Sequence, residues 1–158
     1  MILERIKEKF LDDVYQISEF RGDLIAVIHK NIVCDVMKFL KTDPALDFNI
    51  LMDLTAVDYW GQHRSPRFDV VYNLYSLAKG HRVFIKAGID EKDPEIDSIS
   101  GIWPSADWFE REVWDMFGIK FKGHPNLRRI LMYEEFSGHP LRKDYPYNKR
   151  QPLVGPKN

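Results

Sequence analysis

Hydrophobic and polar positions follow two different periods along the first ninety residues. Apolar residues recur at helical spacing in residues 2–11 and 32–40, which predicts two amphipathic helices. Other runs alternate with a period of two or are rich in β-branched and aromatic residues, as β-strands are. These runs are residues 14–20, 24–28, 50–59, 68–77 and 82–89. The order helix, two strands, helix, three strands predicts an α+β fold in two layers, with a mixed or antiparallel sheet.

Turn-forming residues set the boundaries of these elements. Glycine-centred turns at residues 21–23 and 79–81 are typical of hairpins. Asn31 is expected to cap the second helix. Pro44 ends that helix, because the residue before a proline avoids the α region.

Residues 105–117 combine charged and large apolar side chains and predict a third helix, which we call the motif helix. Ser105 is a suitable N-cap residue, and Gly118 can adopt the left-handed conformation that ends a helix, before a short strand. Asp107, Arg111 and Asp115 follow one another at a spacing of four. Arg111 is therefore expected to be held between two carboxylates.

From residue 122 the composition changes. Five of the nine prolines lie in residues 122–158, which excludes regular helix over most of this stretch. This segment carries 8 basic and 3 acidic side chains, whereas residues 1–121 carry 15 and 21. Its leucines and tyrosines are too numerous for a solvated linker. The sequence therefore predicts an α+β domain (residues 1–121) and an extended basic arm (residues 122–158) that becomes ordered on another protein.

The sequence contains few groups that could support chemistry on their own. A single cysteine, Cys34, excludes an internal disulfide, and a metal cluster or structural zinc site would need several thiolates. We expect Cys34 to be a buried, inert thiol. The five histidines lack metal-ligand spacing, and no glycine-rich phosphate loop occurs. No apolar run reaches the roughly 18 residues that span a membrane.

Two other classes of function stay open on these grounds. Glu110, Glu112 and Asp115 could act as acid–base groups in a stand-alone enzyme for a small molecule. The arm could bind nucleic acid, although its charges come in doublets and the acidic body would repel phosphates.

Two blocks resemble the 30 kDa subunit family of respiratory complex I, the type-1 NADH:quinone oxidoreductase. The first block runs from residue 110 to 131, the second from 138 to 146, and residues 53–59 also fit. The resemblance implies that the shared residues form an interface with partner subunits. They are Glu110, Arg111, Glu112, Asp115, Phe117, Gly118, His124, Pro125, Arg128, Arg129, His139, Pro140, Arg142, Lys143 and Asp144.

The resemblance implies a structural subunit of the peripheral arm of a proton-translocating complex. Such a chain binds no cofactor; NADH, FMN, iron–sulfur clusters and quinone belong to the assembled complex. Its partners would be the large hydrogenase-like subunit and the iron–sulfur subunits, on the cytoplasmic side of the bacterial inner membrane. An equivalent subunit of a membrane-bound hydrogenase, or of another quinone- or ferredoxin-linked dehydrogenase, is the nearest alternative.

The same resemblance gives expectations for individual contacts. Arg128, Arg129, Arg142 and Lys143 would pair with carboxylates of the large subunit. Aromatic residues would supply most of the binding energy; they are Trp108, Trp114, Phe117, Tyr145 and Tyr147.

Overall fold

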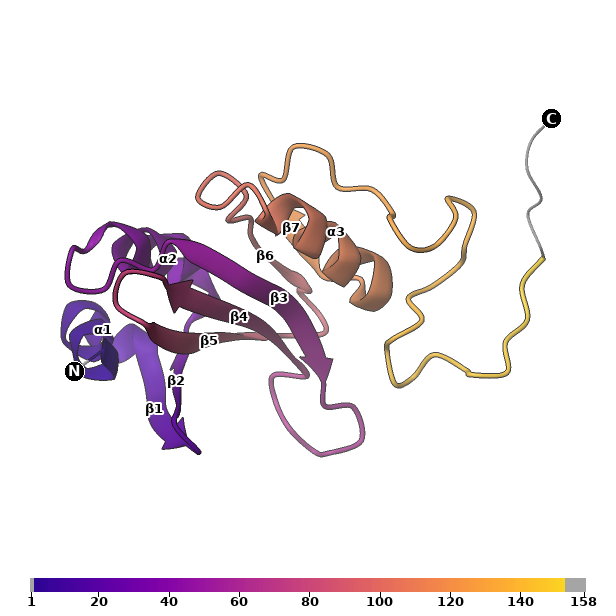
Figure 1. Ribbon diagram of the computed structural model, residues 1–158. Coiled ribbons are helices and arrows are strands. Elements are labelled where there is room, and N and C mark those ends of the chain that lie inside the picture. The colour runs from indigo at the N-terminus through magenta and orange to yellow at the C-terminus, as the bar shows by residue number, and fades with distance from the viewer. Residues whose placement is uncertain (1, 153–158) are drawn as a thin grey trace.

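The computed structural model describes residues 2–152, in which three α-helices and two short 3-10 helices accompany a central sheet (Figure 1). The elements in chain order are α1 (Ile2–Phe10), η1 (Leu11–Asp13), β1 (Val14–Phe20), β2 (Asp23–Ile28), η2 (Lys30–Ile32), α2 (Val33–Thr42), β3 (Ile50–Asp58), β4 (Phe68–Ser76), β5 (His81–Ile89), β6 (Glu95–Asp97), α3 (Ala106–Phe117) and β7 (Lys120–Lys122). The expected α+β fold is confirmed.

Five strands form one mixed sheet in the order β1-β2-β5-β4-β3. The hairpins β1–β2 and β4–β5 and the pair β3–β4 are antiparallel, whereas β2 and β5 run parallel. A second, two-stranded parallel sheet joins β6 to β7. The period of two places alternate residues of β4 and β5 in the core, which explains why the sequence identified these strands.

The hydrophobic core lies between the five-stranded sheet and the helices. Its sheet side is made by residues such as Phe68, Tyr72 and Ile85, which are fully buried. Its helix side includes Ile6 of α1 and Met37 of α2. Helix α1 contacts β1 and β2, and α3 packs on β3 at the other edge of the sheet. The motif helix is therefore fixed to the body of the protein.

Two expected helix caps differ in the structure. Asn31 does not cap α2, because a 3-10 turn (η2) precedes the helix and His29 Nδ1 accepts the N–H of Asn31. Ser105 does occupy the N-cap position of α3, but its side chain makes no capping hydrogen bond. Cys34 is half-buried, and burial raises the pKa of its thiol.

The arm contains turns and bends but no helix or strand from residue 123 to residue 152. The expected boundary at residue 121 falls inside β7 (Lys120–Lys122). Residues 153–158 of the predicted arm lie outside the described residues. In Figure 1 the arm passes alongside α3 and then continues beyond the body.

Candidate partner-docking surface

Helix α3 ends where the sequence predicted, at Gly118. This residue has a φ of 79° and donates its N–H to the carbonyl oxygen of Trp114. A Cβ at this position would lie 2.7 Å from Cδ2 of His139. Gly118 is thus required both by the backbone conformation and by the close approach of the arm.

Three of the four charged residues that the motif places at positions 110–115 are buried. Only Glu112 is exposed. Glu110 has no exposed surface; its carboxylate accepts the N–H of Ile99 at 2.7 Å and the hydroxyl of Ser98 at 2.6 Å. Burial raises the pKa of Glu110 to about 7. Glu110 therefore ties α3 to the segment after β6 and does not face a partner.

Asp115 is the carboxylate that holds the arm on α3. One oxygen accepts three successive backbone N–H groups, those of Ile130, Leu131 and Met132, at 3.0, 2.8 and 2.9 Å. The other oxygen accepts a hydrogen bond from Arg129 at 2.6 Å. Burial works to raise the pKa of Asp115, but these donors lower it below its usual value. We call this arrangement the Asp115 clasp.

Arg111 is not held between Asp107 and Asp115, so that expectation was wrong. Its guanidinium donates to the carbonyl oxygens of Arg128 and Arg129, at 3.1 and 3.0 Å. The buried carboxylate of Asp115 is taken up by backbone N–H groups of the arm instead. Arg111 and Asp115 thus bind opposite polar groups of the same arm segment.

Two histidines of the motif also join α3 to the arm. His124 Nε2 donates to the carbonyl oxygen of Asp107 at 3.0 Å, and its Nδ1 accepts the N–H of Asn126. His139 Nδ1 donates to the carbonyl oxygen of Asp115 at 3.0 Å. Each histidine precedes a proline, Pro125 or Pro140, which keeps the chain extended after the contact.

A second clasp holds the arm against the ends of β3 and β4. Arg67 is buried and donates to both carboxylate oxygens of Asp58, at 2.9 and 2.8 Å, and to Asp144 of the arm at 3.0 Å. Asp58 also accepts the N–H of Lys143 at 2.8 Å. Arg67 lowers the pKa of Asp144 well below its usual range. We call this arrangement the Arg67 clasp.

Sequence reasoning missed two members of the Arg67 clasp, Arg67 itself and Glu91. Neither stood in a block that drew attention, although Asp58 did. Arg142 donates to Glu91 and to Asp144, so it is neutralised within the chain. Arg67 and Asp144 are 77 positions apart, and no local pattern signals such a pair.

Comparisons with known proteins agree on one family. The sequence model described as "Respiratory-chain NADH dehydrogenase, 30 Kd subunit" matches residues 26–151. The chain belongs to this 30 kDa subunit family.

Relatives match along nearly the whole chain. The corresponding NADH-quinone oxidoreductase subunit of Geobacter sulfurreducens is 46% identical over 153 residues, which are 96% of this chain and 93% of that protein. The NADH-quinone oxidoreductase subunit of Roseiflexus sp. is 49% identical over 145 residues, 92% of this chain and 82% of that protein.

Two solved structures share the fold. The trypsin-resistant fragment (1-134) of Nqo5 has a TM-score of 0.70 at 36% identity, covering 80% of this chain and 96% of the fragment. A chain of the membrane-bound sulfane sulfur reductase, an archaeal respiratory membrane complex, has a TM-score of 0.77 at 24% identity, covering 93% and 85%. The second likeness concerns the fold alone.

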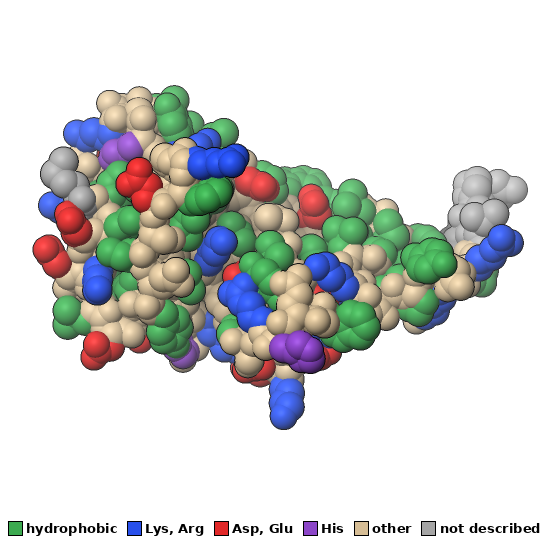
Figure 2. All heavy atoms as spheres, turned by 90° about the horizontal axis from the view of Figure 1, so that it is seen from below, with side chains coloured by type: hydrophobic (Ala, Val, Ile, Leu, Met, Phe, Trp, Pro, Cys, Tyr) green, Lys and Arg blue, Asp and Glu red, His purple; other side chains and the backbone are tan. Residues whose placement is uncertain are grey.

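In this member of the 30 kDa family, the two clasps leave a defined set of family-motif and apolar side chains at the surface. Arg128 and Lys143 are exposed, and their side chains make no ion pair with any residue in 2–152. Large apolar side chains are exposed on α3 and on the arm; they are Trp108, Leu131, Leu141 and Tyr147. Figure 2 shows hydrophobic and basic side chains together along the arm. We call Trp108, Glu112, Arg128, Leu131, Leu141 and Lys143 the docking surface.

Three of the expected aromatic anchors lie elsewhere. Phe117 is buried in the core, and Trp114 is half-buried between the guanidinium of Arg129 and the ring of His139. Tyr145 is half-buried and stacks on Phe136 within the arm. Trp108 and Tyr147 are exposed, as an anchor for a partner must be.

The acidic residues of the motif do not converge on a cavity. The three well-formed cavities among residues 2–152 are lined by other residues than Glu110, Glu112 and Asp115. Over the same range no three histidine, cysteine or acidic side chains are grouped as metal ligands. None of the described helices is long and apolar enough to cross a bilayer.

Proposed function

We propose that this chain is the 30 kDa-family subunit of a proton-translocating NADH:quinone oxidoreductase, where it is a structural subunit of the peripheral arm. The observation that carries the proposal is the match of residues 26–151 to the 30 kDa family. Relatives named as subunits of NADH-quinone oxidoreductase, which match over most of their length, support it. The chain would support electron transfer from NADH to quinone without binding either.

The docking surface is the part of the chain proposed to bind the large hydrogenase-like subunit. The arm has an excess of basic residues, and two of its arginines, Arg129 and Arg142, are neutralised within the chain. Arg128 and Lys143 remain for carboxylates of the partner. Such pairs contribute orientation and selectivity more than net affinity.

Exposed apolar side chains would supply most of the affinity. Trp108 of α3 is 61% exposed, and Leu131 and Leu141 of the arm are 57% and 54% exposed. Side chains of this size are the ones whose burial dominates interfaces. Because both clasps order the arm before the partner arrives, binding costs less conformational entropy than the sequence-based picture of an unstructured arm required.

The redox groups are proposed to lie on other subunits. An iron–sulfur cluster needs several thiolates, and the chain has the single cysteine Cys34. FMN, NADH, the clusters and quinone would accordingly be bound by the partners, which include the iron–sulfur subunits. The chain would reach the cytoplasmic side of the bacterial inner membrane through these partners.

A pull-down from native membranes tests the proposal. The tagged chain is purified from membranes dissolved in a mild detergent, co-eluting chains are identified by mass spectrometry, and NADH-dependent quinone reduction is measured. We expect the large hydrogenase-like subunit and the iron–sulfur subunits to co-elute with activity, and the isolated chain to be inactive. Elution of the chain alone, or turnover by the chain alone, would contradict the proposal.

A further inference from the structure

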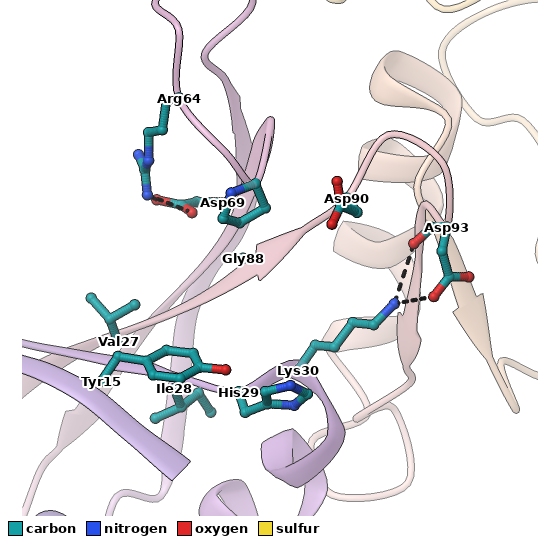
Figure 3. A pocket seen from close by; sticks show the side chains of 11 residues that line it. Tyr15, Val27, Ile28, His29, Lys30, Arg64, Asp69, Gly88, Asp90 and Asp93 are labelled. Atoms are coloured by element: carbon teal, nitrogen blue, oxygen red, sulfur yellow. Dashed lines mark hydrogen bonds and ion pairs between the residues drawn. The ribbon is translucent and has the colours of Figure 1, made fainter. Parts of the chain in front are cut away.

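A hollow at the edge of the body lies apart from the docking surface residues. It encloses about 380 Å³, in the range of ligand sites, and lies where the parallel strands β2 and β5 end (Figure 3). Val27 and Gly88 contribute its floor, and Tyr15 of β1 lines it as well. Pro66 of the β3–β4 loop packs directly on Gly88, since a Cβ there would lie 2.3 Å from Pro66 Cγ. The hollow is thus built between a strand and a loop that are both fixed.

The two cations that line the hollow are already neutralised. Arg64 donates to both oxygens of Asp69, at 2.9 and 2.8 Å, and the Asp69 side chain is only 2% exposed. Lys30 donates to the carboxylate and carbonyl of Asp93 and to a further carbonyl oxygen, so its three N–H groups are used. An anionic ligand would find no unpaired positive charge here.

The groups that remain are negative, aromatic or polar. The carboxylate of Asp90 has no ion pair or hydrogen bond to a side chain or backbone group in residues 2–152. The ring of Tyr15 is 64% exposed. His29 Nδ1 accepts the N–H of Asn31, which leaves the other ring nitrogen as a free donor. Figure 3 shows Tyr15 and His29 from one side of the hollow and Asp90 from another.

We propose that this hollow receives the side chain of an arginine or lysine from a neighbouring polypeptide of the assembled complex, a proposal that rests on the proposed function. Asp90 would pair with the cation, and Tyr15 would contact it through the face of its ring. His29 would donate to a backbone carbonyl oxygen of the same segment, which favours a polypeptide over a free amine. A metal ion fits less well, because no three ligand-type side chains are grouped in the part of the chain described.

Rebinding to the complex provides the test. Membrane complex depleted of this chain is titrated with the purified wild-type chain and with Asp90→Lys, and Asp53→Lys serves as the control. Asp53 is an exposed aspartate of β3, so the control makes the same charge change away from the hollow. We expect Asp90→Lys to weaken rebinding by roughly tenfold or more, whereas Asp53→Lys rebinds like the wild type. Thermal unfolding shows whether each variant is folded.

A cross-link identifies the occupant. With p-benzoylphenylalanine in place of Tyr15, irradiation of the reassembled complex should attach a peptide of another subunit that contains arginine or lysine. Equal rebinding of Asp90→Lys, Asp53→Lys and the wild type, or cross-links only within this chain, would overturn the site while leaving the docking surface intact. If the wild-type chain itself fails to rebind, the proposed function fails and this site fails with it.

Discussion

Glu110 is fully buried and accepts hydrogen bonds from Ser98 and Ile99. Sequence alone predicted that the charged residues of the motif would face a partner. Burial could not be read from their spacing, because the charge pattern of a solvated helix face and that of a helix covered by its own arm are the same. At the scale of single residues, the motif chiefly describes how the chain holds its own arm.

The buried Glu110 gives a pH-dependent stability. Its pKa in the folded chain is about 7, above the ordinary value of 4.5, so the folded state binds the proton more tightly than the unfolded state. The contribution is full below pH 4.5 and is lost as the pH rises towards 7, by on the order of 3 kcal/mol. We expect Glu110→Gln to remove this decline, as measured by urea unfolding across that range. An unchanged slope relative to wild type would contradict it; the exposed Glu112→Gln is the control.

Gly118 offers a matched pair with Gly123. Both have a φ of 79°, but a Cβ at Gly118 meets His139 at 2.7 Å, whereas a Cβ at Gly123 meets nothing within 4 Å. We expect Gly123→Ala to cost about 1 kcal/mol from backbone strain alone. Gly118→Ala should cost more, because the ring of His139 must also move. Thermal unfolding compares the two variants, and equal losses would show that the contact with His139 has no energetic weight.

At the scale of elements, local patterns identified α1, α2, α3 and all five strands of the main sheet. Their periodicity is written in neighbouring residues, so it could be read without the fold. The parallel pairing of β2 with β5 and the Arg67 clasp could not, because each depends on residues far apart in the sequence. For the same reason the arm was expected to need a partner for its order, whereas its described part is held on the chain's own body.

The Asp115 clasp should determine how firmly the arm lies on α3. Asp115→Asn removes the charge that attracts Arg129 and weakens the acceptor for three backbone N–H groups. We expect a loss of about 3 kcal/mol, as for one partner removed from a buried ion pair. Hydrogen exchange of Ile130 to Met132 should accelerate, while exchange in β4 and β5 is unchanged. Equal protection of the arm in Glu112→Gln, Asp115→Asn and the wild type would contradict the clasp.

At the scale of the whole molecule, the chain combines a rigid α+β body with a pre-ordered docking surface. Membership in the 30 kDa family is shared with relatives that match along most of their length. The family motif was enough to predict this membership from the sequence. Which of its basic residues are free for a partner was not predictable, because that depends on the contacts of Arg129 and Arg142 within the chain.

Affinity for the partner subunits measures the central proposal most directly. The double variant Arg128→Glu/Lys143→Glu reverses the two exposed motif charges, and Arg21→Glu/Lys79→Glu makes the same change at the distant hairpin turns. Each purified chain is titrated into complex depleted of the wild-type chain. We predict that the control binds like the wild type, whereas the docking-surface variant, still folded, binds roughly tenfold to a hundredfold more weakly. Equal affinity of all three chains would contradict the account.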